Sequence, residues 1–212
     1  MTDVQQSHTK ELIRLEGVEK HYGSTRVLGV ESLSIYEGDR VLLRGDNGSG
    51  KSTLLRLAAG IIQPDEGLVW RADELRKQRL GYVPQAGGLY EDLTVRNNLH
   101  LRRRLYGLRA VDPASLPYIG RLGLTPFLDK RFIELSGGYQ RLAAVAAAFA
   151  VDPGWLLLDE PFGGVDEHGC SALLDQLYRR EADLAAMIIT DPSGETVLHT
   201  SRVIEMSNGR LG

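Results

Sequence analysis

A glycine-rich segment between an apolar strand and a helix constrains this chain more than any other feature. Residues 45–52 read Gly-Asp-Asn-Gly-Ser-Gly-Lys-Ser, which is Gly, four residues and then Gly-Lys-Ser. The spacing of apolar residues predicts a strand over 40–44 before this segment and a helix over 54–59 after it. Glycines let the backbone curl, so that successive N–H groups and the helix N-terminus face one concave spot that attracts phosphate. The pattern predicts a nucleotide-binding loop.

Each residue of this loop has an expected role. Lys51 is expected to reach the β- and γ-phosphates, and the hydroxyl of Ser52 to bind Mg²⁺. The alternative is a chance glycine turn beside a surface lysine, and the strand before it and the helix after it argue against that. The residues predicted to cradle the nucleotide are Gly45, Asp46, Asn47, Gly48, Ser49, Gly50, Lys51, Ser52 and Thr53.

Two carboxylates follow a second apolar strand, predicted over 155–158. Asp159 and Glu160 would then lie at the carboxyl edge of the sheet, where open α/β folds bind ligands. Asp159 is expected to hold Mg²⁺ and Glu160 to be the general base that polarises an attacking water. Without the phosphate-binding loop, a strand-end carboxylate that caps the next turn would be the better interpretation.

A second glycine-rich segment is predicted to open a long helix that ends at Ala150. Ser136 can cap this helix, and Gly137 and Gly138 follow it. Adjacent glycines are costly in a helix unless something must approach the backbone closely, and a phosphate is such a ligand. One nucleotide does not need two phosphate cradles. The second cradle is therefore expected to serve a nucleotide held by another copy of the chain.

Strands alternate with helices along the chain, and several strands are continuously apolar. This pattern predicts an α/β fold with a mostly parallel sheet covered on both faces, an antiparallel β edge and an inserted helical subdomain. We expect a loose polar tail over residues 1–10 and a single domain over 11–212, with the helical insert at about 86–134. The arginines of that insert are more simply a solvated helix face than a lipid or partner contact: Arg96, Arg102, Arg103, Arg104 and Arg109.

Composition excludes several classes of protein. With 42% hydrophobic and 25% charged residues, the chain of 212 residues is not predicted to be disordered. Its longest apolar run, 142–151, is too short to span a bilayer. A formal charge of −3 provides no basic excess for sequence-independent nucleic-acid binding, so no nucleic-acid partner is expected. The single cysteine, Cys170, allows no internal disulfide and fits a reducing cytosol.

The order of these motifs resembles the nucleotide-binding domain of ATP-binding cassette (ABC) transporters. The resemblance covers about residues 12–211 and rests on the phosphate-binding loop, Gln85, Leu-Ser-Gly-Gly at 135–138, the acidic pair and Asp166. It implies a P-loop NTPase core, ATP and Mg²⁺ as cofactors, and ATP hydrolysis. It also implies a head-to-tail dimer, homomeric or heteromeric, with two ATPs between the subunits. Integral membrane transporter subunits would be partners of this peripheral protein at the cytoplasmic face of the membrane.

The resemblance assigns further roles to matching positions. Tyr22 would stack on adenine, and Gln85 would touch Mg²⁺ and the attacking water. Ser136, Gly137 and Gly138 would contact the γ-phosphate of the ATP bound to the opposite subunit. The loop 163–166 would connect the two subunits, and the insert would dock on the membrane subunits.

This chain departs from the family pattern at three positions. Tyr139 replaces the usual glutamine of the signature, and Ala147 replaces a frequent arginine. Asp191 stands where the family places a histidine at the γ-phosphate. A carboxylate there would repel the phosphate and slow hydrolysis. Alternatively, residues 191–194 are only a turn, and Asp191 has another role.

Three functions remain open at this stage. The first is an ATPase subunit that powers a membrane transporter, with segments 92–99 and 130–134 that resemble exporter-type cassettes. The second is an ATP-dependent regulatory or scaffold switch at the membrane, for which Asp191 is the main support. The third is a cassette of DNA repair or translation. The chain has neither the long coiled coil nor the second cassette that such proteins usually carry.

Overall fold

The computed structural model describes residues 10–192 and 202–212. The predicted polar tail, except for Lys10, and residues 193–194 of the predicted turn lie outside the described residues. Within the described residues, the main sheet has six strands in the order β5-β6-β7-β3-β8-β9. The pairs from β5 through β8 are parallel, and the β8–β9 pair is antiparallel. The strands are β5 (Leu80–Val83), β6 (Trp155–Asp159), β7 (Ala186–Asp191), β3 (Arg40–Arg44), β8 (Arg202–Ser207) and β9 (Arg210–Leu211).

A separate antiparallel sheet lies beside the main one, which makes the antiparallel part larger than the predicted edge. Its order is β2-β1-β4, with β1 (Glu11–Tyr22), β2 (Thr25–Tyr36) and β4 (Glu66–Arg71). The long β1–β2 hairpin turns at Gly23, whose positive φ of 61° suits glycine. The α/β class and the mostly parallel core are confirmed.

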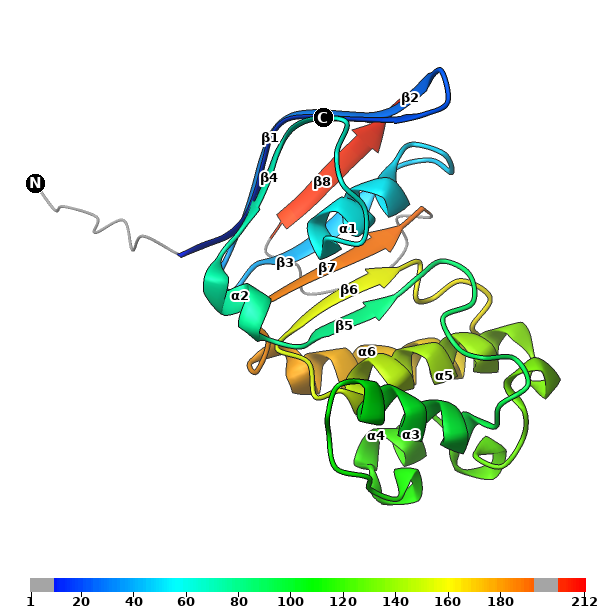
Figure 1. The fold of residues 1–212 in the computed structure, drawn as a ribbon. Coiled ribbons are helices and arrows are strands. Elements are labelled where there is room, and N and C mark those ends of the chain that lie inside the picture. The colour runs from blue at the N-terminus through cyan, green and yellow to red at the C-terminus, as the bar shows by residue number, and fades with distance from the viewer. Residues whose placement is uncertain (1–9, 193–201) are drawn as a thin grey trace, which may run out of the picture.

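Alternating side chains of the main sheet supply two separate hydrophobic cores. Leu43, Leu157 and Ile188 face α1 (Lys51–Ala59) and the antiparallel sheet. The neighbouring residues Leu42, Leu158 and Ile189 face the other helices. Those helices are α3 (Val95–Leu105), α5 (Gly137–Ala150) and α6 (Glu167–Glu181). The two sides of the sheet are visible in Figure 1, with α1 above it and α5 and α6 below.

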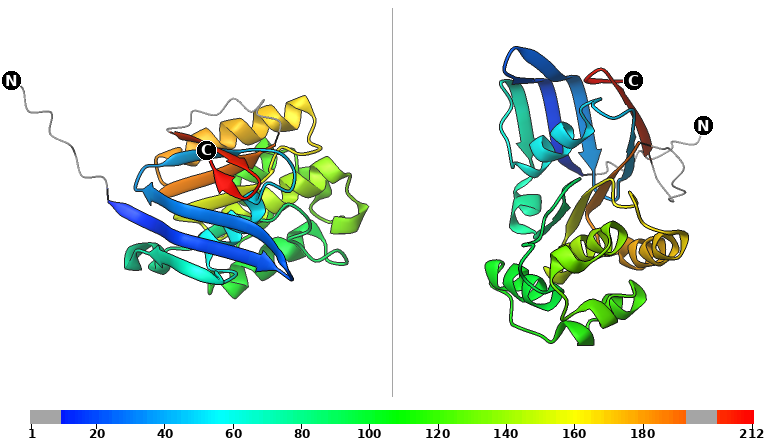
Figure 2. Two further views of the ribbon diagram at one scale, coloured as in Figure 1. Left: turned by 90° about the horizontal axis from the view of Figure 1, so that it is seen from above. Right: turned by 90° about the vertical axis from the view of Figure 1, so that its right-hand side faces the viewer.

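The segment 86–134 contains helices and no β-strand. It holds α3, α4 (Pro117–Arg121) and three short 3-10 turns at Pro113–Ser115, Thr125–Phe127 and Phe132–Glu134. A further short helix, α2 (Asp73–Lys77), precedes β5. Figure 2 shows the green helices of 86–134 as a lobe beside the sheet.

Three arginines of this lobe have partners within the chain, whereas the sequence predicted a solvated helix face. Arg96 forms ion pairs with Asp112 and Asp129 at 2.6 and 2.7 Å. Arg102 donates to the carbonyl of Tyr82, and Arg103 donates to that of Ala150. These internal partners favour the structural interpretation over a lipid-binding patch.

Four neighbouring strands end at one edge of the main sheet, because β5, β6, β7 and β3 are parallel. The residues at or just after these ends are Gln85, Asp159 and Glu160, Asp191, and Gly45. The topology therefore gathers most of the predicted site residues along one edge. Among the described helices, none has the length and apolar character needed to cross a membrane.

Candidate nucleotide-binding site

The loop between β3 and α1 has the backbone geometry that a phosphate cradle needs. Gly45, Gly48 and Gly50 have φ angles of 141°, 81° and 104°, which other residues rarely adopt. A β-carbon on Gly45 would lie 2.1 Å from the carbonyl oxygen of Met206. The loop then leads into α1, whose first N–H groups lack acceptors within the helix and point toward the loop.

Lys51 lies inside this loop. Its side chain is buried, and its ammonium donates to the carbonyls of Gly45 and Asp46 at 2.6 and 2.9 Å. These two bonds hold the ammonium at the centre of the curled backbone. Since an ammonium has three donors, it can also meet a phosphate oxygen.

Ser49, Ser52 and Thr53 complete the loop. Ser49 and Thr53 are buried, whereas Ser52 is half-buried at the start of α1. The exposed part of the loop is Asp46, Asn47 and Gly48. Ser52 is therefore more exposed than Ser49 and Thr53, and its Mg²⁺ role stays a prediction.

Asp159 is fully buried, and only one of its carboxylate oxygens is hydrogen-bonded within the described residues. Oδ1 accepts a 2.8 Å bond from the hydroxyl of Thr190, whereas Oδ2 is buried without a hydrogen-bond partner. Burial of a carboxylate oxygen costs free energy unless a partner compensates it. The free oxygen fits the predicted role of a Mg²⁺ ligand.

Glu160 leaves the strand in an unusual conformation. Its φ is 51°, which is uncommon for a residue other than glycine, and its backbone N–H donates to the Thr190 hydroxyl at 2.8 Å. The side chain is half-buried. Strained residues of this kind occur often at functional sites. Asp159 and Glu160 thus have different surroundings and are suited to different tasks.

Gln85 lies two residues beyond β5, on an exposed loop. Its carbonyl and that of Pro84 accept hydrogen bonds from the guanidinium of Arg141 on α5. Burial lowers the pKa of Arg141, and the charges of Glu160 and Asp159 oppose that shift. Gln85 and Arg141 line one pocket together with Gly137 and Gly163. The Gln85 loop is thereby linked to the helix that opens with Ser136.

Asp191 is the last residue of β7 rather than the first residue of a turn. It is buried, and its backbone pairs in parallel register with Arg44, the residue before the phosphate-binding loop. Pairing with β3 keeps Asp191 in the strand instead of in the turn considered for residues 191–194. The structure therefore places Asp191 at the base of the loop, although its effect on hydrolysis stays a prediction.

Tyr22 lies at the end of β1 and is 47% exposed. The pKa of Arg56 on α1 is raised by the phenol of Tyr82 and, more weakly, by that of Tyr22. Tyr22 is therefore close to the helix that follows the phosphate-binding loop. The ammonium of Lys20 lies over this ring, 5.9 Å from its centroid. Stacking of Tyr22 on a base stays a prediction.

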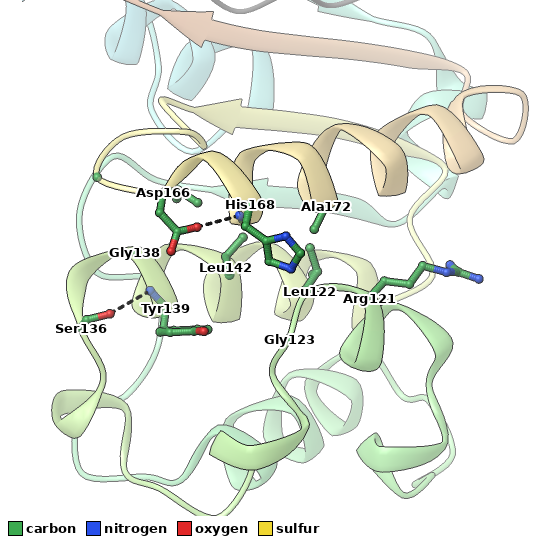
Figure 3. A pocket seen from close by; sticks show the side chains of 13 residues that line it. Arg121, Leu122, Gly123, Ser136, Gly138, Tyr139, Leu142, Asp166, His168 and Ala172 are labelled. Atoms are coloured by element: carbon green, nitrogen blue, oxygen red, sulfur yellow. Dashed lines mark hydrogen bonds between the residues drawn. The ribbon is translucent and has the colours of Figure 1, made fainter.

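The second glycine-rich segment forms a separate site on the other side of the sheet. Ser136 caps α5 and accepts a 3.5 Å bond from the N–H of Tyr139. A β-carbon on Gly138 would lie 2.8 Å from the carbonyl oxygen of Gly164, whereas one on Gly137 would meet nothing within 4 Å. Figure 3 shows Ser136, Gly138 and Tyr139 in a pocket that Asp166 and His168 also line.

Two side chains of the site were not predicted from the sequence. Thr190 joins Asp159 to the backbone of Glu160, and Arg141 holds the Gln85 loop. A hydroxyl at the end of an apolar strand was the available signal for Thr190. Arg141 gave none, because its carbonyl partners are 56 and 57 residues away.

The fold and the site define a nucleotide-binding P-loop protein. A comparison with protein families matches residues 28–163 to the family described as "ABC transporter". The chain belongs to this family. A solved dimeric structure of a bacterial ABC transporter cassette is similar, with 26% identity, a TM-score of 0.81 and coverage of 94% of this chain and 96% of that one. A solved ATP-binding subunit of an ABC transporter has 26% identity and a TM-score of 0.78, and the match covers 94% of this chain and 88% of that one.

Two curated proteins are similar to this chain in sequence. The molybdate/tungstate import ATP-binding protein of Thermococcus kodakarensis is 32% identical over 94% of this chain. The sulfate/thiosulfate import ATP-binding protein of Bordetella pertussis is 34% identical over 94% of this chain. The chain spans 63% and 60% of the length of these relatives. Both are named as import proteins, which conflicts with the expected exporter.

Proposed function

We propose that this chain binds and hydrolyses Mg²⁺-ATP to power a membrane transporter. The observation that carries the proposal is the pair formed by the buried Asp159 and the strained Glu160, at the same sheet edge as the phosphate-binding loop. A cradle for phosphate alone would need neither carboxylate. Cleavage of ATP by water requires one carboxylate that holds Mg²⁺ and another that accepts a proton from the water. Asp159 is suited to the first task and Glu160 to the second.

Each residue of the site has its own role in the proposed reaction. The loop N–H groups and Lys51 hold the phosphates, and Glu160 accepts the proton of the attacking water. Asp159, Ser52 and Gln85 would hold Mg²⁺, which neutralises charge on the phosphate oxygens when it is bound. Thr190 fixes the orientation of Asp159 and the backbone of Glu160 through its two hydrogen bonds.

We propose further that the cradle at Ser136 serves the ATP of a second cassette, the same chain or a different one. Gly137 supports this, because its own chain does not require a glycine there: its φ is ordinary and a β-carbon would meet nothing within 4 Å. A glycine without an intramolecular reason is consistent with the close approach of a ligand or partner. Two chains head to tail would then enclose two ATPs.

The membrane partner is proposed to dock on the helical lobe, at the cytoplasmic face of the membrane. A groove there is lined by Leu89, Tyr90, Leu101 and Leu105. Tyr90 and Leu105 are 63% and 69% exposed, which leaves an apolar patch that a partner would cover. In this proposal the membrane protein provides the transport path.

The names of the relatives favour import as the direction of transport, and the transported substrate would be selected by the membrane subunits. The decisive experiment is co-expression of the chain with the candidate membrane subunits, followed by ATP-dependent transport in vesicles. Transport that is lost in Glu160→Gln supports the proposal. Transport that persists in that variant, although ATP still binds, would favour the switch instead.

A further inference from the structure

We infer that Arg141 is a positioning residue that makes the Gln85 loop move as one body with the start of α5. This inference rests on the proposed ATPase function. Arg141 donates from Nη1 to the carbonyl of Pro84 at 2.9 Å and from Nη2 to the carbonyl of Gln85. The planar guanidinium presents its donors in a fixed fork, so two bonds to consecutive carbonyls define both the position and the orientation of that backbone.

We call these two hydrogen bonds of Arg141 the clamp. The clamp can transmit motion because Arg141 lies near the start of α5. Ser136 caps the same helix five residues earlier, which is about 7.5 Å along the helix axis. A helix is rigid over such a length. Any displacement of Ser136 by a nucleotide on the second cassette is therefore passed to the backbone of Gln85 through one side chain.

The surroundings of Arg141 connect the clamp to the acidic pair. The Gln85 loop is exposed, and within the described residues the carbonyls of Pro84 and Gln85 both accept hydrogen bonds from Arg141. The charges of Glu160 and Asp159 act on the guanidinium, although neither carboxylate lies within ion-pair distance of it. Arg141 thus places a positive charge near both carboxylates while its donors hold the loop.

Arg71 provides a matched control elsewhere in the chain. It donates from Nε to the carbonyl of Ala58 at 2.8 Å and from Nη2 to the carbonyl of Leu57 at 2.9 Å. Burial lowers its pKa, as it does for Arg141. Arg71 therefore makes the same type of clamp with similar burial, on a different part of the backbone.

The test uses a nitroxide spin label on Ala86→Cys in a Cys170→Ser background. We expect Arg141→Met to increase the mobility of the label by about twofold, and Arg141→Lys to do so nearly as much, because an ammonium lacks the fork. Arg71→Met should leave the label unchanged. Equal mobility in Arg141→Met and its parent, or an equal increase in Arg71→Met, would overturn the clamp.

The kinetic part uses the unlabelled chain. Arg141→Met should lower kcat about tenfold, with the KM for ATP within about twofold of the parent, because the residue positions Gln85 without touching the nucleotide. An unchanged kcat, or a loss confined to KM, would overturn the positioning role. If the parent itself does not hydrolyse ATP, the proposed function fails, while the spin-label result still decides the clamp.

Discussion

The hydroxyl of Thr190 donates a 2.8 Å hydrogen bond to Oδ1 of the buried Asp159. The same hydroxyl accepts a 2.8 Å bond from the backbone N–H of Glu160. One side chain therefore orients both the proposed Mg²⁺ ligand and the residue that carries the proposed base. Oδ2 of Asp159 is buried without a hydrogen-bond partner in the described residues, which leaves it for the proposed Mg²⁺.

Thr190→Val removes this hydroxyl and keeps the shape of the side chain. It leaves a buried carboxylate oxygen and a backbone N–H without their partner, so we expect a loss of about 1–3 kcal/mol in the free energy of unfolding. ATP turnover should fall as well, since Asp159 and Glu160 lose their shared support. Urea unfolding and steady-state ATPase assays measure the two effects. Thr190→Ser keeps the hydroxyl and should restore most of both, and failure to do so would show that the methyl group matters instead.

The glycines of the phosphate-binding loop are expected to differ in their sensitivity to alanine. Gly48→Ala meets no atom within 4 Å and carries only the cost of its positive φ, about 1–2 kcal/mol. Gly45→Ala carries backbone strain and also a contact of 2.1 Å with Met206, so the loss should be larger. Thermal and urea unfolding compare the two variants. Equal losses would contradict the geometry of the loop.

Gly137→Ala distinguishes the stability of the monomer from the function of the proposed second cradle. Within one chain the added methyl group meets nothing, and alanine in the first turn of α5 should leave stability unchanged or raise it by about 0.4–1 kcal/mol. ATP-dependent dimer formation by Glu160→Gln protein should nevertheless weaken. Sedimentation with and without ATP measures this. Gly138→Ala is the contrasting variant, because it also clashes with Gly164 and should destabilise the monomer. Normal dimerisation of Gly137→Ala would contradict the shared ATP site.

Asp191→Asn tests the effect of a carboxylate at the position where the family has histidine. Removal of a negative charge near the phosphates should raise ATP turnover by a few-fold, because like charges at close range repel. Steady-state ATPase assays at saturating ATP measure the change. Asp183→Asn, on an exposed residue in the turn that follows α6, is the control. Lower turnover in Asp191→Asn would show that the carboxylate supports the site.

The strands and helices that depend on local sequence patterns were predicted correctly. The strand over 40–44, the capped helix that begins after Ser136 and the buried strand at 155–158 were all predicted near their observed bounds. β4 was missed, because Glu66–Arg71 has little alternation and forms through its pairing with β1. The same limit explains Thr190 and Arg141, whose roles depend on partners that only the folded chain brings near. The possible turn at 191–194 was wrong at its first residue for a related reason, since pairing with Arg44 makes Asp191 the last residue of β7.

The central claim is that Glu160 acts as the base in hydrolysis of Mg²⁺-ATP by this chain. The most direct measurement is steady-state ATP hydrolysis by the purified chain, beside its Glu160→Gln variant, with ATP binding measured for both. We predict Mg²⁺-dependent turnover that falls by about 10²-fold or more in the variant, with ATP binding retained. Equal turnover in the two proteins would contradict the account, as would binding lost together with turnover.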